Sequence, residues 1–197
     1  ESDDQNFDGT GWTLRAKNLD DDVLQLSTTA CTTTEAGESC EVSVSLSQWQ
    51  DHFVSLSVNV SNGNEAEGVL SSTSFVFSAS DWDTPQLLTI TGADDEVDDG
   101  DITYEVSMSA SLSFTDGAGS ATSKAIEGSS VTVTNTDNDT AGLQVHQSGN
   151  VTDEAGNMTA SFTVVLTAQP VTPVIIVPTS DETESSFDVQ QLTFDST

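Results

Sequence analysis

Acidic residues gather in a few short stretches of this chain, and their chemistry is the first functional clue. The longest stretch runs from Asp94 to Asp101, and shorter ones lie at residues 20–22 and 137–139. Calcium takes six to eight oxygen ligands at about 2.3 to 2.6 Å, and loops dense in Asp supply such oxygens without a rigid geometry. The stretches therefore favour a Ca²⁺ site. Acidic loops that merely stay hydrated are the alternative.

The overall charge agrees with a role for cations. The 197 residues include 33 Asp and Glu against 3 Lys and Arg, which gives a formal net charge of −30. Self-repulsion on this scale destabilises a compact state unless cations neutralise it, although a plain solvated acidic surface is also possible. Nucleic acid is excluded as a partner, because Arg15, Lys17 and Lys124 cannot form a phosphate-binding patch.

Membrane insertion and catalysis find no support. No run approaches the roughly 18 apolar residues of a spanning helix. There is no nucleophile elbow, no phosphate-binding loop and no paired His and Cys. Carboxylates are so abundant that no pair stands out as a glycosidase dyad. The sequence therefore predicts a protein that is not an enzyme.

The elements that must position the acidic stretches are β-strands. Apolar residues alternate with polar ones in several runs, as in half-buried strands, and no apolar stripe has the helical period. These runs are residues 40–46, 53–60, 87–90, 102–108, 131–133, 162–166 and 174–177. The predicted fold class is all-β, with tandem immunoglobulin-like antiparallel β-sandwiches.

The chain contains an internal repeat, in which four blocks recur in the same order after 117 to 120 positions. Residues 18–22 recur at 135–139, residues 34–37 at 153–156, Leu46 as Leu166, and residues 74–77 at 191–194. This frame predicts three parts: the last strand of a preceding repeat at 1–18, a complete domain at 19–136 and a truncated second domain at 137–197. Either the chain is a window of a longer array, or a neighbouring molecule supplies the missing strands, with residues 11–17 as a candidate donor.

Over most of its length the sequence resembles the Calx-beta domain, a β-sandwich of sodium–calcium exchangers, integrin tails and large bacterial and algal surface proteins. Four features carry the resemblance. They are the Glu-Ala-Gly that ends the first strand, the Ser180-Asp181 turn, the acidic run at 94–101 and the Asp-Asn-Asp-Thr-Ala-Gly of residues 137–142.

The resemblance implies that carboxylates from these four places converge on Ca²⁺ at one end of the sandwich, beside the linker to the next domain. For the complete domain it implies the ligands Glu35, Asp94, Asp95, Asp98, Asp99, Asp137 and Asp139. The truncated copy keeps Glu154 and Asp181, while Asp20, Asp21 and Asp22 would serve the preceding unit. At the position of Asp181 in the truncated copy, the complete domain has Asn62, which offers a neutral carbonyl oxygen in place of a carboxylate.

Cys31 and Cys40 are the only cysteines and flank the turn that contains Glu35. An even pair at this spacing predicts a disulfide and an oxidising, extracellular or cell-surface location, with two buried free thiols as the alternative. Neither His52 nor His146 has ligand-like spacing to a cysteine, so zinc is disfavoured.

Four sites match the N-glycosylation pattern, and some matches are expected by chance in a chain so rich in Ser and Thr. The asparagines are Asn59, Asn138, Asn150 and Asn157.

The function predicted from these features is that of an extracellular structural protein. Tandem sandwiches would be joined by acidic linkers that Ca²⁺ stiffens, as part of a filament, appendage or long adhesin, with neighbouring copies or repeats as head-to-tail partners. The main alternative is a calcium-dependent binding module that recognises a protein or glycan. A calcium sensor of a signalling protein is a third possibility, which the predicted disulfide disfavours.

Overall fold

The computed structural model describes residues 24–49, 53–115, 119–180 and 186–196. The regular structure of these residues consists of β-strands without a helix, so the all-β prediction is confirmed. Within these ranges no helix has the length and apolarity that a membrane crossing requires. The predicted strand at 1–18 and its candidate donor segment lie outside the described residues.

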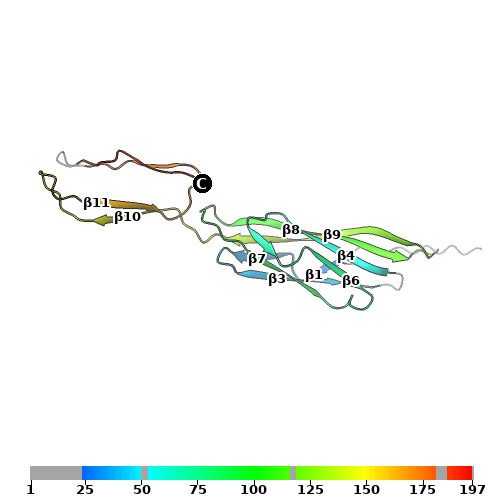
Figure 1. Cartoon of the computed structure of the whole chain (residues 1–197). Helices are drawn as coiled ribbons and strands as arrows, with labels where there is room; N and C mark the ends of the chain where they lie inside the picture. The colour runs from blue at the N-terminus through cyan, green and yellow to red at the C-terminus, as the bar shows by residue number, and fades with distance from the viewer. Residues whose placement is uncertain (1–23, 50–52, 116–118, 181–185, 197) are drawn as a thin grey trace, which may run out of the picture.

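Two sheets pack face to face over residues 24–136 and form a β-sandwich (Figure 1). The first sheet has the order β1-β3-β7-β5, with β1 at Leu24–Leu26, β3 at Ser39–Leu46, β7 at Gln86–Gly92 and β5 at Gly68–Leu70. The second has the order β2-β9-β8-β4-β6, with β2 at Ala30–Thr34, β9 at Ala121–Thr136, β8 at Ile102–Thr115, β4 at Phe53–Asn62 and β6 at Ser74–Ser78.

The chain changes sheets near its first described strands. β1 pairs antiparallel with β3 in the first sheet, whereas β2 pairs parallel with β9 in the second. The other pairings in the sandwich are antiparallel. This strand order is that of an immunoglobulin-like sandwich, as predicted, with one parallel pair added among the described strands.

The core lies between the sheets and follows the predicted alternation. In β3, Val42 and Val44 are completely buried while Glu41 is exposed. Each fully buried Val, Leu, Ile or Phe side chain contributes about 1.5 to 3 kcal/mol, so this core is the main source of stability. The largest fully buried side chains are Phe77, Leu56, Leu88, Ile90, Leu112, Val42, Val44, Val58, Val106, Val131 and Val133.

Four further strands lie beyond one end of the sandwich (Figure 1). β10 at Leu143–Ser148 pairs with β11 at Ser161–Leu166, and β12 at Val174–Ile176 pairs with β13 at Leu192–Phe194. No described residue after Thr136 is buried. These strands therefore form sheets without a closed core.

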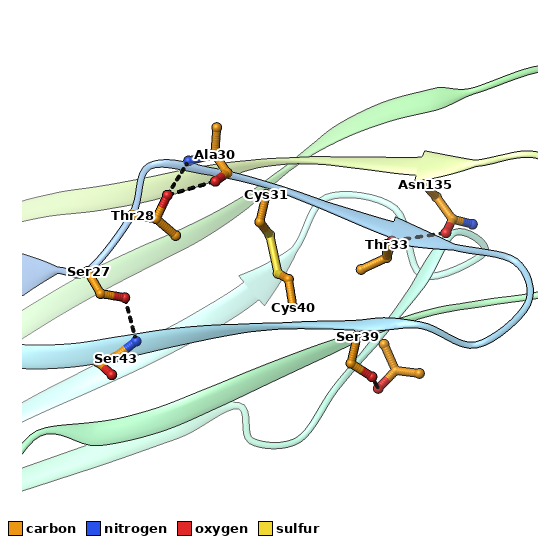
Figure 2. The surroundings of a disulfide bond; sticks show 10 residues. Ser27, Thr28, Ala30, Cys31, Thr33, Ser39, Cys40, Ser43 and Asn135 are labelled. Carbon is orange, nitrogen blue, oxygen red and sulfur yellow. Dashed lines mark hydrogen bonds between the residues drawn. A yellow bond between two sulfur atoms is a disulfide. The ribbon is translucent and has the colours of Figure 1, made fainter.

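A disulfide joins the two sheets of the sandwich (Figure 2). Cys31 of β2 and Cys40 of β3 are bonded, with their Cα atoms 6.2 Å apart, and this confirms the predicted pairing. The bond closes the chain around the turn between β2 and β3. On the Glu35 side of the bond, the hydroxyl of Thr33 donates a hydrogen bond to Oδ1 of Asn135 at 2.9 Å (Figure 2).

Replacing both cysteines, Cys31→Ser with Cys40→Ser, should lower the free energy of unfolding by roughly 2 to 3 kcal/mol, because a short closed loop in the unfolded chain is released. Guanidinium unfolding followed by tryptophan fluorescence measures the loss, with the oxidised parent as the reference. Equal unfolding free energies for the two proteins would contradict a stabilising role of the bond.

Candidate metal centre

Glu35 lies in the turn between β2 and β3, and its side chain is buried, with 3% of its surface exposed. Gly37 has a φ of 85°, a left-handed conformation that glycine adopts without steric cost, and this lets the chain turn back into β3. Oε2 of Glu35 accepts a hydrogen bond from the backbone N–H of Asn138 at 2.9 Å. The turn is thereby tied to the segment that follows β9.

Asp137 and Asp139 reach the same place from the end of β9. One carboxylate oxygen from each of Glu35, Asp137 and Asp139 lies within 4.8 Å of the others. Asp137 accepts hydrogen bonds from the N–H groups of Gly100 and Asp139, each at 2.7 Å. These N–H groups lower the pKa of Asp137, because they favour its charged form.

The negative charge of the cluster formed by Glu35, Asp137 and Asp139 is only partly compensated by the groups around it. Burial raises the pKa of Glu35 above its ordinary value of 4.5, and the nearby Asp137 and Asp95 raise it further, against the lowering effect of the Asn138 N–H. Desolvation likewise raises the pKa of Asp139, with Asp137 as the next cause. The protein therefore pays an electrostatic cost for bringing these carboxylates together.

No basic side chain offsets this cost among the residues that the structure describes. Lys124 is the one Lys or Arg in those ranges. It lies on β9 opposite Leu112, whereas the cluster is at the other end of β9, where Asn135 faces Ile102. At a pH where these carboxylates are ionised, a bound cation would neutralise the charge locally.

The acidic loop at residues 94–101 also forms hydrogen bonds with the linker that follows β9, residues 137–142. Three of its carboxylates accept hydrogen bonds from the linker. Asp94 accepts from the Asn138 side chain at 3.2 Å, Asp98 from the N–H of Ala141 at 2.7 Å and Asp101 from the N–H of Asp137 at 3.2 Å. One carboxylate oxygen of Asp98, which was predicted as a metal ligand, therefore accepts a hydrogen bond from the linker backbone.

Glu67 belongs to this end of the sandwich although the sequence analysis did not select it. It is 5% exposed, and its carboxylate lies within 4.8 Å of those of Asp95 and Asp99. The Asn135 side chain donates to Oε2 of Glu67 at 3.2 Å. The sequence between Asn62 and Gly68 contains two acidic residues, Glu65 and Glu67, and nothing local singles out Glu67.

Among the described residues, Asn62 and Glu154 are not brought into the cluster. Asn62 donates from its side chain to the carbonyl of Gly68 at 2.6 Å and accepts from the N–H of Asn64 at 3.0 Å, so it shapes a turn. Glu154 is exposed and belongs to neither carboxylate group. Asp20, Asp21, Asp22 and Asp181 lie outside the described residues.

The donor set is suited to a hard cation. The two groups are Glu35 with Asp137 and Asp139, and Glu67 with Asp95 and Asp99. All six donors are carboxylates, which suit Ca²⁺ or Mg²⁺ better than soft metals. The ligands come from a turn, a loop and a linker, so their spacing can adjust to the larger and more flexible coordination sphere of Ca²⁺.

A scan against protein-family models finds no match, and neither does a search of curated proteins. Among solved structures, the periplasmic chaperone SfaE shares 14% identity and a TM-score of 0.39, over 58% of this chain and 57% of the chaperone. CBD12 from CALX1.2 shares 12% identity and a TM-score of 0.36, over 88% and 71% of the two chains. The chaperone YadV shares 11% and 0.39, over 88% and 81%. Such low scores assign no family, so Calx-beta membership stays a prediction.

In the absence of divalent cations, Glu35→Gln should raise the melting temperature at neutral pH. The amide removes a buried negative charge and keeps an oxygen for the Asn138 N–H. A raised pKa in the folded protein means that protonation of Glu35 stabilises the fold below about pH 4.5, and that this stabilisation is lost as pH rises through the raised pKa. The advantage of the variant over the parent should therefore grow from about pH 4.5 towards neutral pH.

Melting curves in chelator across this pH range measure the difference. Asp83→Asn is the matched control, because it removes one exposed charge from the turn before β7, at the opposite end of that strand from the cluster. A difference between the Glu35→Gln variant and the parent that does not change with pH would contradict an ionised, buried Glu35.

Proposed function

We propose that residues 24–141 act as a calcium-dependent structural module of an extracellular filament, appendage or long adhesin. The observation that carries the proposal is the convergence of the buried Glu35 with Asp137 and Asp139, at the point where the chain leaves the sandwich. An ion at this position neutralises charge that no basic side chain in the described residues offsets. The proposed role is therefore to couple the sandwich to the segment after it.

The proposed mechanism is a cross-link through one ion. Glu35 belongs to the turn between β2 and β3, while Asp137 and Asp139 belong to the linker. Ca²⁺ bound to all three joins the turn and the linker, so the linker loses freedom to bend. Because a ligand that binds only the folded state stabilises it, the same ion also raises stability.

The tandem arrangement is part of the proposal. We take residues 19–136 as one unit and residues 137–197 as the beginning of a second, with further repeats or copies arranged head to tail. The matching strand pairs support this division: Leu24 faces Leu46 in β1–β3, and Leu143 faces Leu166 in β10–β11.

The proposed location outside the cell is supported by the disulfide. The Cys31–Cys40 disulfide is typical of an oxidising compartment. The asparagines of all four glycosylation patterns, Asn59, Asn138, Asn150 and Asn157, are exposed. A glycan on Asn138 would stand directly beside the proposed ion.

Calcium should raise the thermal stability of the chain, and chelator should reverse the effect. At free calcium of about 100 times the dissociation constant, binding to the folded state adds about 2.7 kcal/mol. The Glu35→Gln variant should lose most of this response, whereas Asp83→Asn should keep it. Thermal melts of the three proteins, with and without calcium, measure it. Identical melting temperatures of the parent in calcium and in chelator would refute the proposed site.

Calcium should also narrow the range of distances between the sandwich and the strands after it. Spin labels on non-natural amino acids at Thr132 of β9 and Gln144 of β10, both exposed, leave the disulfide intact. Pulsed electron resonance should show a broad distance distribution in chelator and a narrower one in calcium. The Glu35→Gln protein should stay broad in both conditions. Equal widths of the parent's distance distribution in calcium and in chelator would contradict the stiffening role, whether or not calcium raises the stability.

A further inference from the structure

We propose that Asn135 is a positioning residue of the metal centre, and that its buried amide raises the calcium affinity by holding Glu67 in place. The inference rests on the calcium binding proposed above and adds a residue that acts on it. Asn135 acts through the groups that it hydrogen bonds, without contact to the ion.

Asn135 is a polar residue at a core position of β9. Val131 and Val133, on the same face of this strand, are completely buried, and Asn135 itself is 1% exposed. Side chains at every second position of a strand share one face, so the pattern predicts another apolar residue here. Burial of an amide costs free energy unless hydrogen bonds satisfy it. The hydrogen bonds of Asn135 therefore explain why an amide is tolerated at this position.

Three hydrogen bonds connect the amide with three different segments. Oδ1 of Asn135 accepts from the hydroxyl of Thr33 on β2 at 2.9 Å. Nδ2 donates to Oε2 of Glu67, between β4 and β5, at 3.2 Å, and to the carbonyl of Ala93, directly after β7, at 2.9 Å. The amide thus uses both its acceptor atom and its donor atom.

The three segments also carry carboxylates of the two groups. Thr33 precedes Glu35 by two positions, and Ala93 directly precedes the acidic loop at 94–101. Glu67 is itself a member of the second group. A displacement of this one amide therefore reaches the turn, the loop and the buried carboxylate together.

The packing around the amide is close. A Cβ atom added at Gly92 would overlap Oδ1 of Asn135 and the carbonyl oxygen of Thr34. Glycine at this position lets the end of β7 approach β2 and β9. The close approach confines the amide between the ends of the two sheets.

A neutral donor suits a carboxylate that has to bind a cation. Glu67 is 5% exposed and needs a hydrogen-bond donor. A lysine in place of Asn135 would also donate, but its positive charge would compete with the ion. The N–H of Asn135 holds Glu67 without cancelling its charge, so the carboxylate stays available to a cation.

The test is a double-mutant cycle on the calcium affinity of the full chain. Asn135→Leu keeps the branching of the side chain and removes the amide. It should raise the calcium dissociation constant about 10- to 100-fold, the range typical of groups that orient metal ligands. Glu67→Gln alone should also weaken binding. In the Glu67→Gln background, Asn135→Leu should raise the constant less than about 3-fold, because residues that act through one another are not additive.

Isothermal titration calorimetry measures the constants, at a temperature at which circular dichroism shows each protein to be folded. Thr33→Val is the second variant, for the case that Asn135→Leu does not fold, and it should raise the constant in the parent background alone. Thr103→Val is its matched control, because it removes a hydroxyl that pairs with Thr134 on the outer face of the same sheet. The control should bind calcium as the parent does.

Two results would overturn the positioning role while calcium binding stands. One is an equal rise of the dissociation constant in both backgrounds, since the effect would then not pass through Glu67. The other is an unchanged constant with only a lower melting temperature in chelator, which would identify a purely structural role for Asn135. A parent chain that binds no calcium would refute the proposed function, and this inference with it.

Discussion

The buried charge of Glu35 is the constraint on which the functional end of the sandwich depends. A carboxylate with so little exposure needs hydrogen bonds or a cation. The fold supplies the N–H of Asn138 from the linker, the N–H of Glu35 donates to the carbonyl of Thr136 at 3.1 Å, and the disulfide joins β2 to β3 on either side of the turn. The turn, the acidic loop and the linker are therefore parts of one electrostatic arrangement, in which the position of each affects the others.

Much of the fold could be predicted from the sequence because its strands have one buried face. Apolar patterning identified parts of β3, β4, β7, β8, β9, β11 and β12. It did not identify β1 and β5, which have three residues each, whereas the equally short β12 was found because residues 174–177 form a continuous apolar run. It also could not identify the parallel pairing of β2 with β9, since Ala30–Thr34 contains polar residues whose partner is about a hundred positions away. Such a pairing is decided by tertiary packing.

The candidate site could be predicted in part, for a related reason. The resemblance to the Calx-beta domain implied Glu35 and Asp137 as ligands, and the structure places their carboxylates together. Glu67 was missed because nothing local distinguishes it from an exposed acidic residue; its burial follows from the approach of Asn135 on a distant strand. Asp98 stays a predicted ligand, and one of its two carboxylate oxygens accepts the Ala141 N–H.

The parallel pairing of β2 with β9 has a mechanical consequence. The chain enters the pair at Ala30, opposite Thr132, and leaves it at Thr136, opposite Thr34. A pulling force applied through the two ends of the unit therefore acts in opposite directions along neighbouring parallel strands. The hydrogen bonds between them are loaded together in shear, whereas those of an antiparallel hairpin pulled from its open end break one after another. The same few residues that carry the chain from one sheet to the other thus form the force-bearing clamp of the sandwich.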